Sequence, residues 1–335
     1  MTIFLNVLFL VVGMVLLIKG ADFFVNGASA VAKRLKVPAM FIGLTIVALG
    51  TSLPELSVSV TSAIGGSLDM SVGNIVGSNL FNMLFILGLV AIFNPVKMAD
   101  TTKKIDFPFL IVVTGALFLF SLDMILNETA VNILSRTESI VLLIFVILYL
   151  YILVSNANKS RKLLLMDAKE KGVVVEEKDE IKDYKVWQII MFLIAGLAMV
   201  VFGGECVSTT AQYLAIKMGM SEALVGLTIV AVGTSLPELV TSVVAAKKGE
   251  NDLALGNVIG SNIMNISLIL GLVGTIGQAP ISVEILTDMA ILFGATIMFT
   301  ILCVRKNDIS KKEGIILFCT YLAYVAFTIV RNYCF

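Results

Sequence analysis

Residues 42–59 read IGLTIVALGTSLPELSVS, and residues 225–242 repeat them as VGLTIVAVGTSLPELVTS, with 14 of 18 positions identical. The same offset of 183 residues aligns GNIVGSNLFNMLFILGLV at 73–90 with GNVIGSNIMNISLILGLV at 256–273, where 11 of 18 positions are identical. Many of the identical positions are Gly, Pro, Ser, Thr, Asn or Glu, which are polar or helix-breaking residues within apolar runs. The chain is therefore duplicated, and the duplication preserves polar residues in apolar surroundings.

The composition indicates an integral membrane protein. The 335 residues are 58% hydrophobic and only 14% charged, whereas soluble domains carry about 25% charged residues. The first apolar stretch lacks a basic leading segment and a small-residue cleavage site, so we interpret it as a retained span and not a signal peptide. Histidine is absent. Any binding chemistry must then come from carboxylates, amides, hydroxyls and backbone.

Apolar runs long enough to cross about 30 Å of hydrocarbon predict an all-α protein with ten transmembrane helices. They lie near residues 2–20, 38–64, 70–93, 106–124, 138–155, 187–204, 221–246, 253–275, 284–304 and 313–331. The side reached after the odd-numbered spans holds 21 of the 24 Lys and Arg residues. By the positive-inside rule this side is cytoplasmic, so both termini are expected to be extracellular, in a multi-pass protein of the cell membrane.

The two copies are expected to be inverted relative to each other. Five predicted helices separate equivalent positions, and an odd number of crossings makes the second copy enter the membrane from the opposite side. We therefore predict a first five-helix repeat at 1–155, a charged cytoplasmic linker at 156–185 and a second inverted repeat at 186–335. The duplicated motifs cover 43–90 and 226–273. This architecture is typical of secondary transporters, although a duplication can also produce a symmetric bundle without transport.

Two glutamates are isolated within the apolar runs. Glu55 is the only charged residue between Lys36 and Asp69, and Glu238 is the only one between Glu222 and Lys247. An ionised carboxylate at membrane depth costs several kcal/mol unless it faces a partner or a cavity. Because no basic residue lies in the spans that carry the motifs, a bound cation or a proton is the expected counter-charge.

Each glutamate follows a proline that interrupts its helix. Pro54 and Pro237 remove a helical hydrogen bond and clash with the carbonyl four residues earlier, which belongs to a glycine in each copy. The neighbouring Thr and Ser hydroxyls add oxygens beside the freed carbonyls. Irregular backbone at this depth is tolerated where it is buried or lines an aqueous site. A proline kink alone is a weak signal, but a kink with a glutamate, two hydroxyls and a second copy indicates a binding site.

The second duplicated segment provides a polar stripe that we expect to face the broken helices. Its residues are spaced by four and so share one helix face; they are Asn74, Ser78 and Asn82 in the first copy and Asn257, Ser261 and Asn265 in the second. Such residues also serve as hydrogen-bonding contacts between helices. Together with the glutamates they form an all-oxygen set, which suits hard cations such as Ca²⁺. Na⁺ is also hard and similar in radius.

At these motifs the chain resembles the sodium/calcium exchangers of the cation/Ca²⁺ antiporter superfamily, whose two repeats carry G-T-S-x-P-E and G-S-x-x-x-N. The resemblance covers nearly the whole chain and implies Na⁺/Ca²⁺ antiport by alternating access. It also implies three Na⁺ per Ca²⁺ and an electrogenic cycle. The ligands that it implies are Ala48 and Ala231 through their carbonyls, and Thr51, Ser52, Glu55, Ser78, Asn82, Thr234, Ser235, Glu238, Ser261 and Asn265.

Two departures from the family pattern narrow this interpretation. Position 265 is Asn, where potassium-dependent relatives and some archaeal members carry Asp, so the resemblance implies potassium independence. The 156–185 linker is far shorter than the regulatory region of animal exchangers, and regulation of that kind is not expected. The expected partners are Na⁺, Ca²⁺ and the lipid bilayer, with no cofactor and no nucleic acid.

Three other functions remain open at this point. The same glutamates could carry protons in an H⁺/Ca²⁺ antiporter, although the Thr-Ser pairs favour sodium. An intramembrane hydrolase could use them as an acid/base pair, but the sequence has no His for H-E-x-x-H or a Ser/His pair, and no paired aspartates of the kind such enzymes use. A passive channel usually builds its filter from repeated loops around a central pore.

Overall fold

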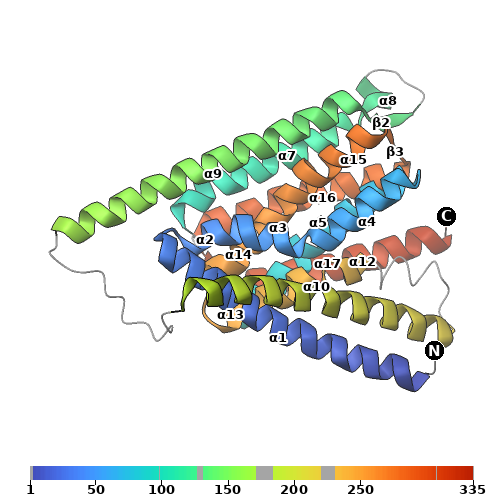
Figure 1. The fold of residues 1–335 in the computed structure, drawn as a ribbon. Helices are drawn as coiled ribbons and strands as arrows, with labels where there is room; N and C mark the ends of the chain where they lie inside the picture. The colour runs from blue at the N-terminus through green and yellow to red at the C-terminus, as the bar shows by residue number, and fades with distance from the viewer. Residues whose placement is uncertain are drawn as a thin grey trace.

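The computed structural model describes residues 3–97, 99–126, 131–170, 184–219, 231–306 and 308–334, and most of them are helical (Figure 1). Up to residue 170 the elements are α1 (Ile3–Leu35), α2 (Ala39–Ile42), η1 (Gly43–Val47), α3 (Ala48–Thr51), α4 (Leu53–Ile64), α5 (Leu68–Leu80), η2 (Phe81–Ile86), α6 (Leu87–Phe93), β1 (Val96–Lys97), η3 (Thr102–Asp106), α7 (Phe107–Phe120), α8 (Asp123–Leu126), β2 (Asn132–Leu134) and α9 (Arg136–Glu170). Elements labelled η are π-helical.

The described chain after residue 183 is also mostly helical. Its elements are α10 (Val186–Lys217), α12 (Ala231–Thr234), α13 (Leu236–Lys247), α14 (Asn251–Met264), η5 (Asn265–Leu270), α15 (Gly271–Ile276), β3 (Ala279–Ile281), α16 (Val283–Lys306), β4 (Asp308–Ile309) and α17 (Lys311–Cys334).

Seven of the described helices are long and apolar enough to cross a membrane, and the bent pair of segments Ala39–Thr51 and Leu53–Ile64 makes an eighth. These eight match eight of the ten predicted spans. The predicted span at 106–124 corresponds to α7, which has only 14 residues and continues from the π-helix η3. Part of the predicted span at 221–246 lies outside the described residues. The described chain is therefore that of a multi-pass membrane protein.

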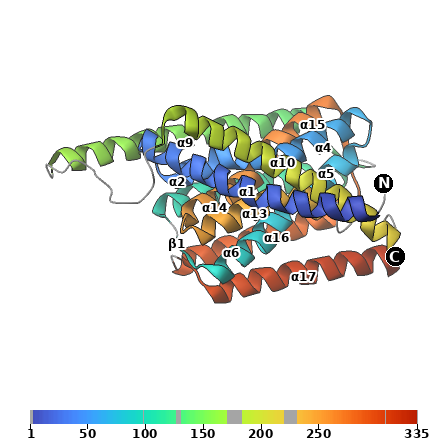
Figure 2. The same ribbon diagram turned by 60° about the horizontal axis from the view of Figure 1, so that its bottom comes forward.

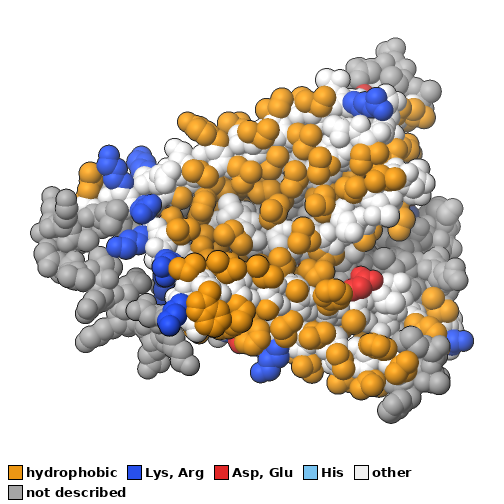
Figure 3. Space-filling model, viewed as in Figure 1, with side chains coloured by type: hydrophobic (Ala, Val, Ile, Leu, Met, Phe, Trp, Pro, Cys, Tyr) orange, Lys and Arg blue, Asp and Glu red, His pale blue; other side chains and the backbone are white. Residues whose placement is uncertain are grey.

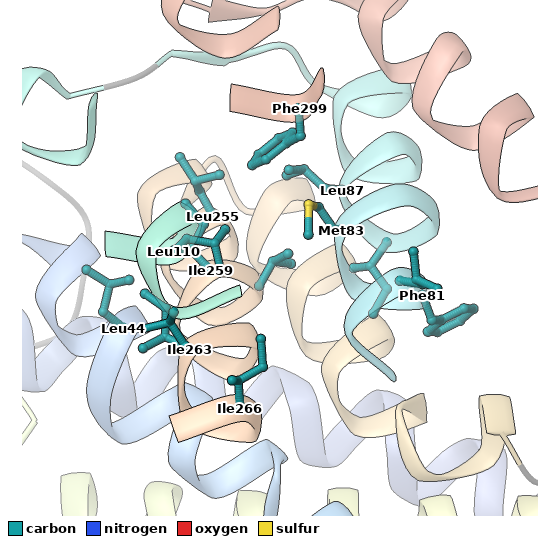
Figure 4. Close-up of a cluster of buried hydrophobic side chains, with 14 of the residues drawn as sticks. Leu44, Phe81, Met83, Leu87, Leu110, Leu255, Ile259, Ile263, Ile266 and Phe299 are labelled. Atoms are coloured by element: carbon teal, nitrogen blue, oxygen red, sulfur yellow. The ribbon is translucent and has the colours of Figure 1, made fainter. Parts of the chain in front are cut away.

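Two continuous helices form the centre of the molecule. In Leu68–Phe93 (α5, η2 and α6) and in Asn251–Ile276 (α14, η5 and α15), 78% of the most apolar window is buried, against 17–28% in the other five spans. Buried side chains of the second helix, among them Ile259 and Ile263, pack near Leu44 of η1 (Figure 4). The duplicated GSN segments thus lie where protein, not lipid, surrounds them.

The first broken helix bends by 46° between α3 and α4. Pro54 lies in the first turn of α4, where the missing N–H costs nothing because the first N–H groups of a helix have no internal partner. Ser52 joins the two segments with φ −82° and ψ 10°, and its counterpart Ser235 joins α12 to α13 with φ −90° and ψ 8°. Both copies of the motif therefore break their helix in the same way.

The long helices α1 and α10 lie side by side (Figures 1 and 2). Both extend beyond the predicted spans 2–20 and 187–204. The first predicted span ends before Asp22, but this residue lies within α1, where its carboxylate is 2.7 Å from Lys248 Nζ. No proline occurs between Asp22 and Pro38, and the helix continues to Leu35.

Glycines allow close contact between α1 and α10. A Cβ on Gly196 would lie 2.5 Å from the backbone nitrogen of Phe24 and 2.9 Å from the carbonyl oxygen of Gly20. A Cβ on Gly13 would lie 3.0 Å from the carbonyl oxygen of Gly203. Small residues at such crossings let helix backbones approach within van der Waals distance.

Gly196→Ala is therefore expected to lower the thermal stability of the detergent-solubilised protein. The added methyl group meets backbone atoms that cannot rotate away, and overpacking of this kind costs about 1–3 kcal/mol. The matched control is Gly294→Ala in α16, where nothing lies within 4 Å of the place that an added Cβ would take. If both variants melted at the wild-type temperature, the tight contact between α1 and α10 would be contradicted.

Two short antiparallel ribbons close opposite ends of the bundle. β1 pairs with β4, and β2 pairs with β3. The β2–β3 ribbon lies at the right-hand end of Figure 1, whereas β1 lies at the left-hand end of Figure 2. In both ribbons a strand from before residue 171 pairs with a strand from after residue 183.

The predicted linker at 156–185 is only partly described. Residues 156–170 continue α9 as a helix, because this stretch contains no proline and no glycine. Residues 171–183 lie outside the described part of the chain.

Candidate cation site

The two glutamates occupy equivalent positions in the broken helices. Glu55 lies in the first turn of α4 and Glu238 in the first turn of α13, and both residues are fully buried. The N-terminal end of a helix carries a partial positive charge, which favours a carboxylate at that place. None of the ion pairs found among the described residues involves either glutamate.

Each glutamate is bound by the serine of the other copy. Ser52 Oγ donates to Glu238 Oε1 at 3.0 Å, and Ser235 Oγ donates to Glu55 Oε1 at 2.8 Å. The first contact maps onto the second by the 183-residue offset of the sequence repeat. Both broken helices thus meet at one place, and their carboxylates share it.

The central helices contribute further oxygens to this place. Ser78 Oγ of α5 is 3.5 Å from Glu55 Oε1, and Ser261 Oγ of α14 is 3.5 Å from the carbonyl oxygen of Ala48. Thr51 Oγ1 lies 3.0 Å from Asn257 Oδ1, and also within reach of the carbonyl oxygens of Val47 and Ala48. A hydroxyl oxygen that donates its hydrogen to such an acceptor keeps lone pairs for a cation.

Several buried polar atoms have no hydrogen-bond partner among the described residues. In the predicted site they are Glu55 Oε2, Glu238 Oε2, both polar atoms of the Asn82 side chain, Thr234 Oγ1 and Asn265 Oδ1. Buried polar groups are nearly always satisfied, so a group of unsatisfied oxygens in one region requires an explanation. Two carboxylates with amide and hydroxyl oxygens are the ligand types that Na⁺ and Ca²⁺ take.

Irregular helix geometry coincides with the two asparagines. Asn82 lies in the π-helix η2 and Asn265 begins the π-helix η5, at equivalent positions of the repeat. The η5 segment packs against α4, which carries Glu55, and η2 packs against α13, which carries Glu238. π-Helical turns within α-helices occur frequently at functional sites.

A family model matches most of the chain. The family model described as sodium/calcium exchanger protein matches residues 5–155 and 188–330. The chain belongs to the sodium/calcium exchanger family. The match includes both broken helices, both central helices and the helices on either side of them.

Full-length relatives and a solved structure support this membership. A protein named CaxA from Alkalimonas amylolytica is 39% identical over 95% of this chain and 96% of its own. Sodium/calcium exchanger MaX1 from Methanosarcina acetivorans is 33% identical over 98% of this chain and 99% of its own. The fold matches the sodium-calcium exchanger NCX_Mj with a TM-score of 0.80, at 30% identity over 96% of this chain and 98% of that one.

Four polar residues that were not predicted from the sequence contact this region. Ser59 Oγ accepts from Asn74 Nδ2 at 3.1 Å, and Ser242 Oγ accepts from Asn257 Nδ2 at 2.9 Å. Asn79 and Asn262, which follow Ser78 and Ser261, are also buried between the central helices. A signal for all four was present in the sequence, because each is identical in the two copies of the repeat.

Among the predicted ligands, Ala231 lies at the edge of the described residues. It begins α12, directly after residues 220–230, which lie outside the described part of the chain. The role implied for its carbonyl stays a prediction.

Proposed function

We propose that the protein is a secondary active antiporter that exchanges Na⁺ for Ca²⁺ across the cell membrane by alternating access. The observation that carries this proposal is the crossed pair of contacts, Ser52 with Glu238 and Ser235 with Glu55, which bring two buried carboxylates together without a basic partner among the described residues. Family membership supports a transport function over an enzymatic one.

The proposed cation ligands follow the two copies of the motif. In the first copy they are Ala48, Thr51, Ser52, Glu55, Ser78 and Asn82, and in the second they are Ala231, Thr234, Ser235, Glu238, Ser261 and Asn265. Side chains of the two copies contact each other at Ser52 and Glu238, at Ser235 and Glu55, and at Thr51 and Asn257. These contacts support a single site built by both halves.

Three observations support two inverted five-helix repeats and ten transmembrane helices. When the two copies are interchanged, the contact of Ser52 with Glu238 becomes the contact of Ser235 with Glu55. The ribbons pair strands from the two halves, and they lie at opposite ends of the bundle. Gly13 faces Gly203 and Gly20 faces Gly196, where Gly196 and Gly203 are the counterparts of Gly13 and Gly20. A two-fold axis in the membrane plane produces all three patterns.

The distribution of basic side chains supports the proposed topology. Figure 3 shows Lys and Arg gathered mainly at one end of the molecule, on the face that it displays. Assigning this end to the cytoplasm places the linker at 156–185 inside the cell and both termini outside, in accordance with the positive-inside rule.

An H⁺/Ca²⁺ antiporter is the second candidate function. The buried Glu55 and Glu238 favour it because carboxylates are the only described groups of the site that can carry protons. The hydroxyls of Thr51, Ser52, Thr234 and Ser235 favour sodium, because they add neutral oxygens that a proton does not need and a Na⁺ ion does.

Transport by purified protein in vesicles tests the proposal. Vesicles loaded with Na⁺ and diluted into Na⁺-free buffer should accumulate ⁴⁵Ca²⁺, whereas vesicles loaded with K⁺ or choline should not. Omitting K⁺ from both sides should leave the rate unchanged, since position 265 is a neutral Asn. Uptake driven by an outward proton gradient without Na⁺ would instead establish the second candidate.

A further inference from the structure

Asn79 links the two central helices through both ends of its side chain. It lies in α5 between Ser78 and the π-helix η2, and it is fully buried. Its Nδ2 donates to the backbone carbonyl of Asn262 at 3.2 Å, and its Oδ1 accepts from Asn265 Nδ2 at 3.1 Å. Asn79 therefore connects a fixed backbone group to a proposed cation ligand.

The direction of these hydrogen bonds follows from the chemistry of the groups. A backbone carbonyl can only accept, so the amide nitrogen of Asn79 must face Asn262 and its oxygen must face Asn265. Asn265 must then present its own nitrogen to Asn79. The remaining atom, Asn265 Oδ1, is buried and has no hydrogen-bond partner among the described residues. The backbone of α14 thus determines which atom of Asn265 is available to a cation.

The equivalent residues of the other copy do not make this connection. Asn262 and Asn82 correspond to Asn79 and Asn265, yet the side-chain nitrogen and oxygen of both lack a hydrogen-bond partner among the described residues. The contact is therefore a particular feature of position 265, and not a general consequence of packing asparagines between these helices.

We infer that Asn79 is a positioning residue for the cation site: it orients Asn265 so that Oδ1 serves as the ligand, and it requires a hydrogen-bond donor at position 265. The inference rests on the proposed function, since it assumes that a cation binds at Asn265. In an Asn265→Asp variant with the new carboxylate ionised, two oxygen atoms would face each other across the contact, and neither could donate.

A double-mutant cycle on Ca²⁺ binding distinguishes positioning from a merely structural role. The four proteins are wild type, Asn79→Ala, Asn265→Asp and the double variant, measured by Ca²⁺ titration of purified protein in Na⁺-free buffer. With Asn265 intact, Asn79→Ala should weaken Ca²⁺ binding about tenfold, because the freed amide can turn its nitrogen toward the cation. Added to Asn265→Asp, it should leave the affinity unchanged or raise it, since both terminal atoms of a carboxylate are oxygens.

Asn262→Ala is the matched control for this cycle. Its side chain has no hydrogen-bond partner among the described residues, so its effect should be the same with Asn265 intact and in the Asn265→Asp variant. Asn79→Ser, which keeps a small polar group, replaces Asn79→Ala if the latter elutes as aggregate in size-exclusion chromatography. Neither Asn79→Ala nor Asn79→Ser should orient Asn265 as Asn79 does.

The possible outcomes separate this inference from the proposed function. An equal loss of affinity from Asn79→Ala in both backgrounds overturns the positioning role, even if Na⁺-driven uptake is normal. Ca²⁺ binding with the expected non-additivity, but without Na⁺-driven uptake, supports the positioning role and contradicts Na⁺/Ca²⁺ exchange. A wild-type protein that binds no Ca²⁺ overturns both.

Discussion

Replacing Glu55 or Glu238 by Gln is expected to abolish Na⁺-driven Ca²⁺ uptake while the protein still folds. The two carboxylates are the only acidic side chains of the proposed site, so either substitution halves the charge that faces a divalent ion. At about 4 Å, one unit charge interacts with another by roughly 4 kcal/mol at an effective dielectric constant near 20, and a doubly charged ion doubles this energy. A loss of this size reduces occupancy of the site by several orders of magnitude.

The crossed serine contacts make the Gln substitutions conservative in shape. Ser52 and Ser235 can each donate to a Gln carbonyl oxygen as they donate to the carboxylates, so the fold is expected to survive. The control is Glu284→Gln, which changes an exposed carboxylate at the start of α16 and should leave uptake intact. Ca²⁺ uptake near the wild-type rate in either site variant, with expression and melting temperature unchanged, would contradict the assignment of the site.

Much of the described fold was predictable, because the apolar runs and the helix-breaking residues occur in both copies of the repeat. Long apolar runs indicated eight of the spans that the structure describes, since the bilayer fixes the length of a spanning helix. The break before Glu55 followed from Pro54 and its neighbouring glycine, which act locally through the backbone. Such features depend on residues close in sequence, and a single chain displays them directly.

The features that were not predicted depend on tertiary contacts. α1 continues past Asp22, whose carboxylate pairs with Lys248, more than 200 residues away. The contact of Thr51 with Asn257 and the fixed orientation of Asn265 by Asn79 arise where two helices meet. Sequence spacing placed Asn74, Ser78 and Asn82 on one face, but it could not show that their neighbour Asn79 would contact a proposed ligand of the other copy.

The buried, unpartnered oxygens also give a physical reason why the proposed site can hold either of two cargoes. Glu55 and Glu238 supply two negative charges, which one Ca²⁺ balances in full. The neutral ligands proposed near them, Thr51, Thr234 and the two asparagines, provide oxygens without adding charge, so smaller charges can be spread over several subsites. Because we propose that both cargoes use these same oxygens, binding of one is expected to favour release of the other.

Na⁺-driven Ca²⁺ uptake is expected to depend strongly on membrane potential. We propose that three Na⁺ exchange for one Ca²⁺, as the resemblance to the family implies, so each cycle moves one net positive charge in the direction of sodium. At 100 mV this charge is worth about 2.3 kcal/mol, which changes the equilibrium Ca²⁺ gradient roughly fiftyfold. An interior-positive potential should therefore accelerate Ca²⁺ uptake into Na⁺-loaded vesicles, and an interior-negative potential should slow it.

Two independent ways of setting the potential make this prediction decisive. Valinomycin with a K⁺ gradient gives one, and a thiocyanate gradient gives the other without K⁺, so any transport of K⁺ by the protein would appear as a difference between them. With the same sign of potential, both should change the rate in the same direction, because the effect arises from the net charge moved and not from the ion that sets the voltage.

If uptake proceeds at one rate under both signs of potential, the exchange is electroneutral. The cycle would then carry two Na⁺ per Ca²⁺, and a third sodium subsite would be ruled out.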